Sequence, residues 1–88
     1  MRCRSRLEIY LDLLHAVSNS SNIADVVKKA RLSLSVTIKQ LAFLTSQGLV
    51  LTLITDDRVI KYELTAKGFE TLMAFLRLTA KEQPILQQ

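Results

Sequence analysis

Apolar residues recur along this chain at spacings of three and four, the period of an amphipathic α-helix. Residues 5–17 form the first such pattern, with one apolar face made of Leu7, Tyr10, Leu11, Leu14 and Val17. Ile9 and Leu13 lie off that face and widen the apolar surface beyond the needs of a single core. A polar connection then leads to Asn22, a good N-cap for a short second helix over residues 22–30.

A third helical pattern begins after a tight turn at residues 31–33. Ser33 stands where an N-cap belongs and Gly48 where a helix stops, which predicts a helix over residues 33–47. A rotation of about 100° per residue gives an inward face of Leu34, Thr37, Ile38, Leu41, Leu44 and Thr45. The opposite face holds Ser35, Val36, Lys39, Gln40, Phe43, Ser46 and Gln47. Two helices separated by so short a turn are typical of a helix-turn-helix.

After Gly48 the apolar period changes from that of a helix to that of a strand. On the returning strand, Ile60, Tyr62 and Leu64 alternate with polar residues, so residues 49–64 are predicted to form a β-hairpin with its turn at residues 55–58. Thr65 then caps a last helix over residues 66–82, and Pro84 bars its regular continuation.

These elements predict a mainly α fold with a β-hairpin, in one domain over residues 1–88. The arrangement is a winged helix-turn-helix: three helices, a two-stranded wing and a C-terminal dimerisation helix. The last helix is apolar over so wide an arc that a second subunit is expected to cover part of it. The expected homodimer interface consists of Ile9, Leu13, Leu72, Phe75, Leu76 and Leu78.

The charges of the chain are unevenly placed. The net charge is +4, and residues 1–49 carry seven basic side chains against three acidic ones, whereas residues 50–88 carry five of each sign. A polyanionic partner such as DNA explains this excess, since cationic side chains displace the counterions condensed on phosphates. An ordinary soluble surface with a modest positive excess explains it equally well.

The outward face of the third helix has chemistry suited to a DNA groove. Glutamine can bridge adenine, lysine can reach guanine, and a valine methyl can touch thymine. The candidate DNA-binding residues are Ser35, Val36, Lys39, Gln40, Arg31, Lys28, Lys29 and Arg58. The arginines of the N-terminal arm are further candidates for phosphate contacts. In the hairpin turn, Arg58 could enter a minor groove, although Asp56 and Asp57 beside it would repel the DNA backbone.

Residues for enzyme chemistry are scarce. His15 is the only histidine and is expected to pack at the edge of the first helix, and Cys3 cannot form an internal disulfide. We expect no catalytic residues, metal site, cofactor or small-molecule ligand. No apolar run approaches the ~18 residues of a membrane span, and no secretory leader is recognisable. A cytoplasmic, nucleoid-associated location is expected.

Four segments resemble an archaeal winged-helix family that contains the small "ten-a" DNA-binding proteins and related transcription regulators. These segments are Arg4-Ser-Arg-Leu-Glu-Ile, Ala30-Arg-Leu-Ser, Gly48-Leu-Val and Tyr62-Glu-Leu-Thr-Ala-Lys-Gly68. The resemblance extends from about Ser5 to Leu78 and implies a homodimer joined through the last helix. By position, it implies that Ser33 is the cap, that Ser35, Val36, Lys39 and Gln40 face the groove, and that Gly68 allows close packing on the hairpin. The chain departs from the ten-a proteins in its shorter terminal helix and its longer, more acidic wing.

The sequence therefore predicts a dimeric, sequence-specific DNA-binding regulator that reads the major groove with its third helix. Two alternatives remain open at this stage. The first is a winged-helix module that binds another protein, favoured by the single cation on the outward helix face, the acidic wing and the outward Phe43. We expect Phe43 to pack under the hairpin or against a partner. The second alternative is a non-specific architectural DNA binder.

Overall fold

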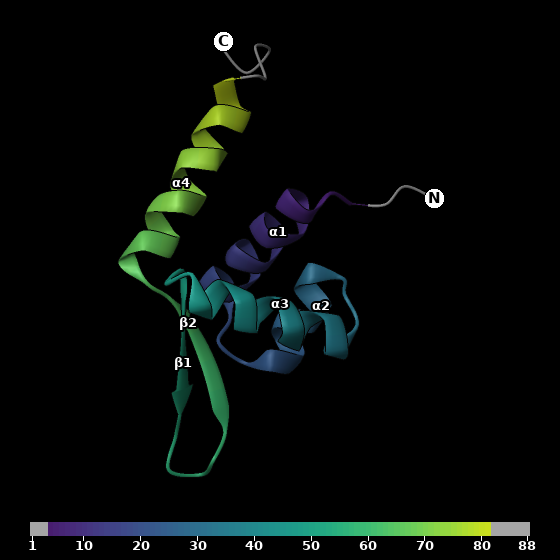
Figure 1. Ribbon diagram of the computed structural model, residues 1–88, viewed down its shortest axis with the longest axis vertical. Coiled ribbons are helices and arrows are strands. Elements are labelled where there is room, and N and C mark those ends of the chain that lie inside the picture. Colours follow the sequence, from purple (N-terminus) through teal and green to yellow (C-terminus); the bar gives the residue numbers. More distant parts are fainter. Residues whose placement is uncertain (1–3, 82–88) are drawn as a thin grey trace.

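The computed structural model describes residues 4–81, with side chains described as far as Leu78. Its elements, in chain order, are α1 (Arg6–Asn19), α2 (Ile23–Ala30), α3 (Leu34–Ser46), β1 (Val50–Ile54), β2 (Ile60–Leu64) and α4 (Ala66–Lys81). The helices α1, α2 and α3 form the body, while α4 and the hairpin leave it in opposite directions (Figure 1). This is the predicted winged-helix fold. Cys3 and Pro84 lie outside the described residues.

Side-chain caps fix the starts of the helices, and those at Asn22 and Ser33 were predicted from the sequence. The Ala24 N–H donates to Asn22 Oδ1 (2.7 Å) at the start of α2, and the Val36 N–H donates to Ser33 Oγ (3.2 Å) at the start of α3. At the start of α1, Ser5 and Glu8 form a reciprocal capping box. Gly48 ends α3 with a φ of 77°, a left-handed conformation that favours glycine.

The core lies around α1, which contacts α2, α3, α4 and β2. Its fully buried side chains include Leu13, Leu14, Val26, Leu41, Leu44, Val50 and Leu72. Leu13 was expected on an outer surface, yet none of it is exposed. A helix surrounded by neighbours is buried over most of its circumference, so its apolar arc is wider than one stripe. The apolar excess on this part of α1 therefore serves the monomer core.

The hairpin is antiparallel, and its register pairs Val50 with Leu64 and Ile54 with Ile60. Because paired residues share a face, Ile54 and Ile60 lie on the same face as the buried Tyr62. Both isoleucines are nevertheless exposed, since the outer half of the hairpin projects past the helices (Figure 1). At its base, the Tyr62 N–H donates to the Ser21 carbonyl (3.1 Å), which ties the segment before α2 to the wing.

Candidate nucleic-acid interface

The turn between α2 and α3 is made by Arg31, a non-glycine residue in the left-handed conformation (φ 59°). Its N–H donates to the carbonyls of Val27 (3.0 Å) and Lys28 (3.3 Å), which closes the end of α2. Ser33, two residues later, is the N-cap of α3, which begins at Leu34. The predicted helix-turn-helix is therefore present, and its geometry leaves the Arg31 side chain exposed.

Arg4 reinforces this turn from the N-terminal arm. Its guanidinium donates to the Ala30 carbonyl (2.7 Å), to the Arg31 carbonyl (2.9 Å) and to Asp12 Oδ2 (2.6 Å). The last carbonyls of a helix lack intrahelical partners and carry partial negative charge, so a guanidinium stabilises them well. Arg4 was expected among the phosphate contacts of the arm; the structure places it instead as a brace across α1 and the end of α2.

The burial of its side chains divides α3 into an inner side and an outer side. Thr37, Leu41 and Leu44 are buried and define its inner side. The predicted groove residues Ser35, Val36 and Lys39 are exposed, whereas Gln40 is half-buried. The half-burial of Gln40 follows from its position next to Leu41 and one turn before Leu44, near the inner side.

The inward face of α3 was partly misassigned from the sequence. Leu34 and Ile38 were expected inside but are 53% and 48% exposed. Leu34 lies in the first turn, and Ile38 lies about a quarter-turn away from the Thr37–Leu41–Leu44 line. Ala42, which was not singled out from the sequence, is also exposed on the outer side. The outer side of α3 therefore carries more apolar surface than the sequence pattern indicated.

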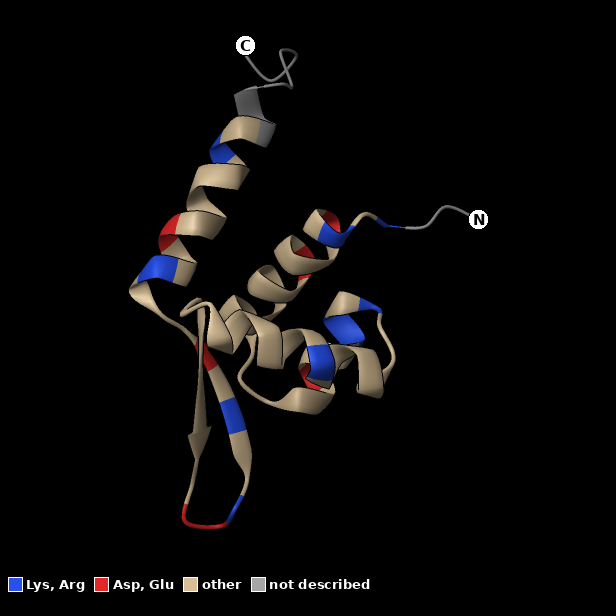
Figure 2. Ribbon diagram, viewed as in Figure 1, with Lys and Arg blue, Asp and Glu red and all other residues tan. Residues whose placement is uncertain are grey.

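Basic side chains gather where α2 ends. Lys28, Lys29 and Arg31 are all exposed, and Lys39 lies on the exposed side of α3. Figure 2 shows these basic positions on α2 and α3, and the acidic residues of the wing at its tip. Among the side chains that the structure describes, no hydrogen bond or ion pair engages these four cations. Their charges are therefore directed to solvent or to a partner.

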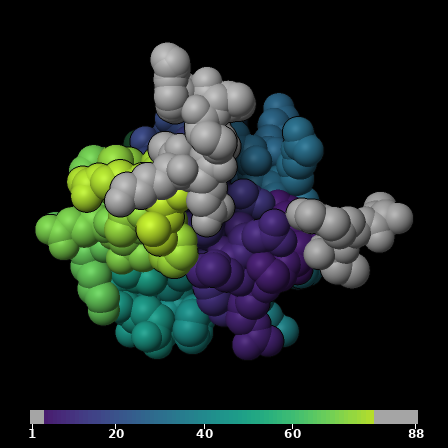
Figure 3. All heavy atoms as spheres, turned by 90° about the horizontal axis from the view of Figure 1, so that it is seen from above, coloured from purple at the N-terminus to yellow at the C-terminus, as the bar shows by residue number. Residues whose placement is uncertain are grey.

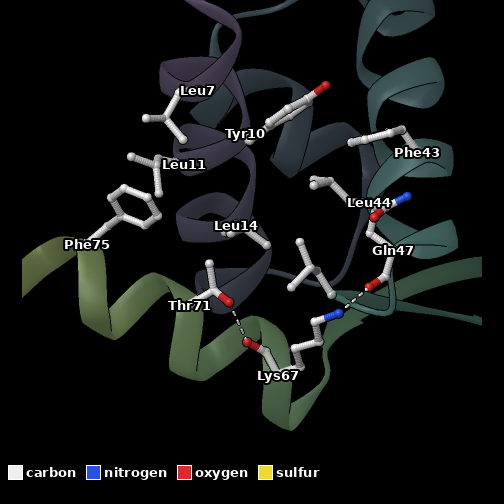
Figure 4. A pocket seen from close by; sticks show the side chains of 11 residues that line it. Leu7, Tyr10, Leu11, Leu14, Phe43, Leu44, Gln47, Lys67, Thr71 and Phe75 are labelled. Carbon is white, nitrogen blue, oxygen red and sulfur yellow. Dashed lines mark hydrogen bonds between the residues drawn. The ribbon is translucent and has the colours of Figure 1, made fainter.

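Phe43 is engaged within the subunit. Its ring stacks on that of Tyr10 of α1, with centroids 5.3 Å apart and planes inclined by 19°. The two rings face each other across the gap between α1 and α3 (Figure 4). Phe43 was expected to pack under the hairpin or against a partner; within the subunit, α1 and not the hairpin supplies the surface for its ring. Phe43 keeps part of its area exposed, but its position is fixed by this stack.

The wing tip spans residues 55–59. The Thr55 N–H donates to the Val59 carbonyl (3.0 Å), and the Arg58 N–H donates to the Thr55 carbonyl (2.8 Å). Arg58 has a φ of 63°, a left-handed conformation that lets the chain turn back after Asp57. All three charged tip residues, Asp56, Asp57 and Arg58, are exposed. The structure brings Arg58 to the far end of the wing, with the two acids directly beside it.

The segment Leu64-Thr-Ala-Lys-Gly68 attaches α4 to the end of α3. Thr65 Oγ1 donates to the Gly48 carbonyl (2.6 Å) and accepts from the Gly68 N–H (3.0 Å), so it caps α4 as predicted. Lys67 Nζ donates to the Gln47 carbonyl (3.0 Å), a bond drawn in Figure 4. This small cluster fixes where α4 leaves the end of α3.

The expected interface residues divide into three groups by their burial in the monomer. Leu13 and Leu72 are 0% and 2% exposed inside the monomer, so they offer no surface to a partner, and their assignment to the interface is wrong. Leu76 and Leu78 are exposed, whereas Ile9 and Phe75 are half-buried. Seen from above, α4 and α1 lie side by side (Figure 3), so the inner side of α4 is covered by α1.

A groove of about 340 Å³ runs between α1, α3 and α4. Its apolar walls include Leu7, Leu11 and Phe75, and Lys67 and Gln47 close one end (Figure 4). Phe75 was expected at the dimer interface, and its ring points towards Leu11 of α1 in the same subunit (Figure 4). Among residues 4–81, no three His, Cys, Asp or Glu side chains could together hold a metal ion. No helix within the same residues is long and apolar enough to cross a bilayer.

The sequence profile of the winged helix-turn-helix family matches residues 3–83. The chain belongs to the winged helix-turn-helix family. Its winged-helix fold is similar to that of the Lactococcus lactis ZitR C30AH42A mutant in apo form, with a TM-score of 0.75 and 20% identity over 93% of this chain and 64% of that one. No curated protein matches the winged-helix chain by sequence.

Two further structures have the same fold. One is a MarR-family transcriptional regulator from Silicibacter pomeroyi, with a TM-score of 0.74 and 20% identity over 91% of this chain and 57% of that one. The other is BpsR of Bordetella bronchiseptica, whose DNA binding is regulated by 6-hydroxynicotinic acid, with a TM-score of 0.74 and 17% identity over 83% and 55%. The winged-helix chain thus spans less than two thirds of each of these proteins.

Proposed function

We propose that the protein binds double-stranded DNA as a homodimer and acts as a sequence-specific transcriptional regulator. The observation that carries this proposal is the pairing of an exposed α3 surface with the exposed cations Lys28, Lys29 and Arg31 at the adjacent end of α2. In a helix-turn-helix the second helix enters the major groove and the first crosses the phosphate backbone. The basic end of α2 would then meet phosphates while α3 meets base edges.

The roles of individual residues follow from their positions. Ser35, Val36 and Lys39 face the bases, with Gln40 at the edge of the contact. Arg58 at the wing tip reaches towards the neighbouring minor groove, and the acids beside it limit that contact to the arginine side chain. A single cation on α3 provides little affinity, so a pair of protomers and their flanking cations must supply the rest.

The exposed side of α4 supports the dimer. Phe69, Leu76 and Leu78 are 52%, 44% and 56% exposed on a helix that rises away from the body (Figure 1). Leu76 lies two turns after Phe69 on one side of α4, whereas Leu78 lies on the opposite side of the helix. Exposed apolar surface of this extent is stabilised when a second subunit covers it. The resemblance to the archaeal ten-a proteins, which dimerise through their last helix, favours the same arrangement here.

Titration with duplex DNA at several salt concentrations tests the DNA proposal. If each protomer neutralises about three phosphates, a dimer releases counterions from about six, and log affinity should fall against log salt with a slope of about −5. Lys29→Gln should reduce the slope by about 2 in the dimer, whereas Arg77→Gln, which removes the same charge from α4, should leave it unchanged. Absence of binding to any duplex overturns the proposal.

Two other functions give different results in the same experiment. Equal affinity for unrelated duplexes would indicate an architectural binder, whereas selection of one sequence from a random pool indicates a specific regulator. The exposed Leu51, Ile54 and Ile60 of the hairpin favour the second candidate function, a module that binds a protein partner. In that case a substitution in the hairpin would abolish partner binding and the protein would show no salt-dependent affinity for DNA.

A further inference from the structure

The outer side of α3 exposes branched apolar side chains that the core does not use. Thr37, Leu41 and Leu44 complete the buried side of the helix. Val36 and Ile38 are 38% and 48% exposed and flank the outermost positions, which are occupied by Ser35, Lys39 and Ala42. Ile38 and Ala42 are one turn apart and share a flank, whereas Val36 lies on the other flank.

These side chains are unusual choices for a solvated helix face. Valine and isoleucine have lower helix propensity than alanine, lysine or glutamate, and their exposure to water is unfavourable. In a helix, however, β-branching restricts χ1 to essentially one rotamer. Their methyl groups therefore project in fixed directions, and ordering them against a partner costs little conformational entropy.

The charges around these residues distinguish between two kinds of partner. Lys39 lies between Val36 and Ile38 on the exposed surface, and three further cations lie at the end of α2. The buried centre of a protein–protein interface is depleted of charge and of lysine in particular. A major groove suits this mixture, because thymine methyl groups alternate there with hydrogen-bond acceptors and phosphates border the groove.

The dimensions of the groove allow both flanks to make contact. A B-DNA major groove is about 12 Å wide and an α-helix with its side chains is about 10–12 Å across, so opposite flanks of an inserted helix face opposite strands. Resting on the proposed DNA-binding function, we propose that α3 selects A·T base pairs through thymine methyl groups. Ile38 with Ala42 contacts one strand and Val36 the other, while Lys39 donates to acceptors between them.

The wing geometry is consistent with this assignment. Thr45 Oγ1 and Thr52 Oγ1 are hydrogen-bonded (3.3 Å), so the flank of α3 that includes Thr45 and Ile38 is the one turned towards β1. The wing face that carries Thr52 also carries Ile54 and Ile60. Leu51 lies on the opposite face of the hairpin, which makes it a matched apolar control for Ile38.

The experiment compares thymine with uracil, which differ only in the 5-methyl group. A duplex is selected from a random pool with the full-length protein, and each thymine of the half-site is then replaced by uracil. Removal of one buried methyl group should weaken binding about fourfold, and replacement of all contacted thymines should weaken it by more than tenfold. The salt slope should not change, since the phosphates are unaltered.

Variants assign the effect to particular residues. Ile38→Ala should bind the thymine and uracil duplexes with nearly equal affinity at the contacted position, whereas Leu51→Ala should discriminate as the wild type does. Ile38→Val, which removes one methyl group and keeps the branched side chain, should show intermediate discrimination; thermal unfolding monitors the fold of each variant.

The outcomes separate this inference from the proposed function. Salt-dependent binding with equal affinity for thymine and uracil duplexes overturns methyl recognition and leaves DNA binding intact. A selected half-site without A·T pairs likewise overturns methyl recognition and leaves DNA binding intact. If Ile38→Ala lowers the affinity for both duplexes equally, Ile38 does not contact the methyl group. Absence of binding to every duplex overturns both proposals.

Discussion

Gly68 lies so close to the end of α3 that a Cβ atom at this position would be 2.0 Å from the carbonyl oxygen of Leu49. The first turn of α4 therefore packs directly on the backbone that follows α3. Thr65 and Lys67 add hydrogen bonds to the carbonyls of Gly48 and Gln47, the two residues just before Leu49. The orientation of α4 is thus tied to the end of α3, as the small residue expected at position 68 allows.

The first prediction concerns this contact. Gly68→Ala should lower the free energy of unfolding by about 1–3 kcal/mol, since the added methyl group overpacks against a backbone oxygen that cannot easily move. The gain in helix propensity from alanine, about 1 kcal/mol, offsets part of the loss. Chemical denaturation measures the change. Ala74→Ser, at an exposed position of the same helix, should change stability by less than ~0.5 kcal/mol; equal effects of the two would contradict the clash.

The brace formed by Arg4 gives a second prediction. Arg4→Gln should lower the free energy of unfolding by about 1–2 kcal/mol, since the carbonyls of Ala30 and Arg31 lose a charged donor at the helix end. Asp12→Asn should cost less, about 0.2–1 kcal/mol, because the ion pair is partly exposed. Arg6→Gln is the control: its exposed side chain should contribute less than ~0.5 kcal/mol. Thermal unfolding of the three variants measures these losses. If Arg4→Gln destabilised the protein no more than Arg6→Gln does, the bracing role of Arg4 would be refuted.

Thr37 gives a prediction of the opposite sign. Its side chain is fully buried on the inner side of α3, and its hydroxyl has no hydrogen-bond partner among the described residues. An unsatisfied buried hydroxyl costs about 1–3 kcal/mol. Thr37→Val should therefore raise the midpoint of urea unfolding, by an amount that corresponds to about 1 kcal/mol. Thr52→Val, where the hydroxyl is bonded to Thr45 and the residue is exposed, should not stabilise the protein.

The stack of Tyr10 on Phe43 is testable by a double-mutant cycle. The single variants Tyr10→Leu and Phe43→Leu and the double variant should give a coupling free energy of about 0.5–1.5 kcal/mol in unfolding experiments, since stacked rings are worth that much beyond their buried area. Coupling near zero would show that the rings merely lie close together. The same cycle on Leu7 and Phe43 supplies the comparison, because no ring contact links that pair.

Local chemistry explains which features were predictable from the sequence. Ser33, Asn22, Thr65 and Gly48 act on backbone groups within a few residues of themselves, so their positions alone indicate where helices begin and end. The face of α3 was harder to assign. Leu34–Ile38–Leu41 and Thr37–Leu41–Leu44 both satisfy the spacing of a helix, and only the packed neighbours show that the second line is buried.

Contacts between distant segments were not predictable. The guanidinium of Arg4 reaches residues 26 and 27 positions away, and no local pattern in the sequence indicates that reach. For the same reason the sequence pattern assigned Leu13 and Leu72 to the dimer interface. Both belong to the monomer core, because α1 has neighbouring elements on most of its sides. The sequence pattern therefore overestimated the surface left for a partner and underestimated the apolar surface of α3.

The proposed dimer is tested at the outer end of α4, where the exposed Leu76 and Leu78 are free of the monomer core. Mass measurement in solution should give twice the chain mass of 10.0 kDa, and Leu78→Asp should shift the protein to the monomer, because it would bury an unpaired charge in the interface. Leu51→Asp, an equally drastic change on the exposed outer face of the wing, should leave the dimer intact. Since two protomers share the phosphate contacts, the monomeric variant should also show about half the wild-type salt slope on DNA. A wild-type monomer at micromolar concentration would refute the interface.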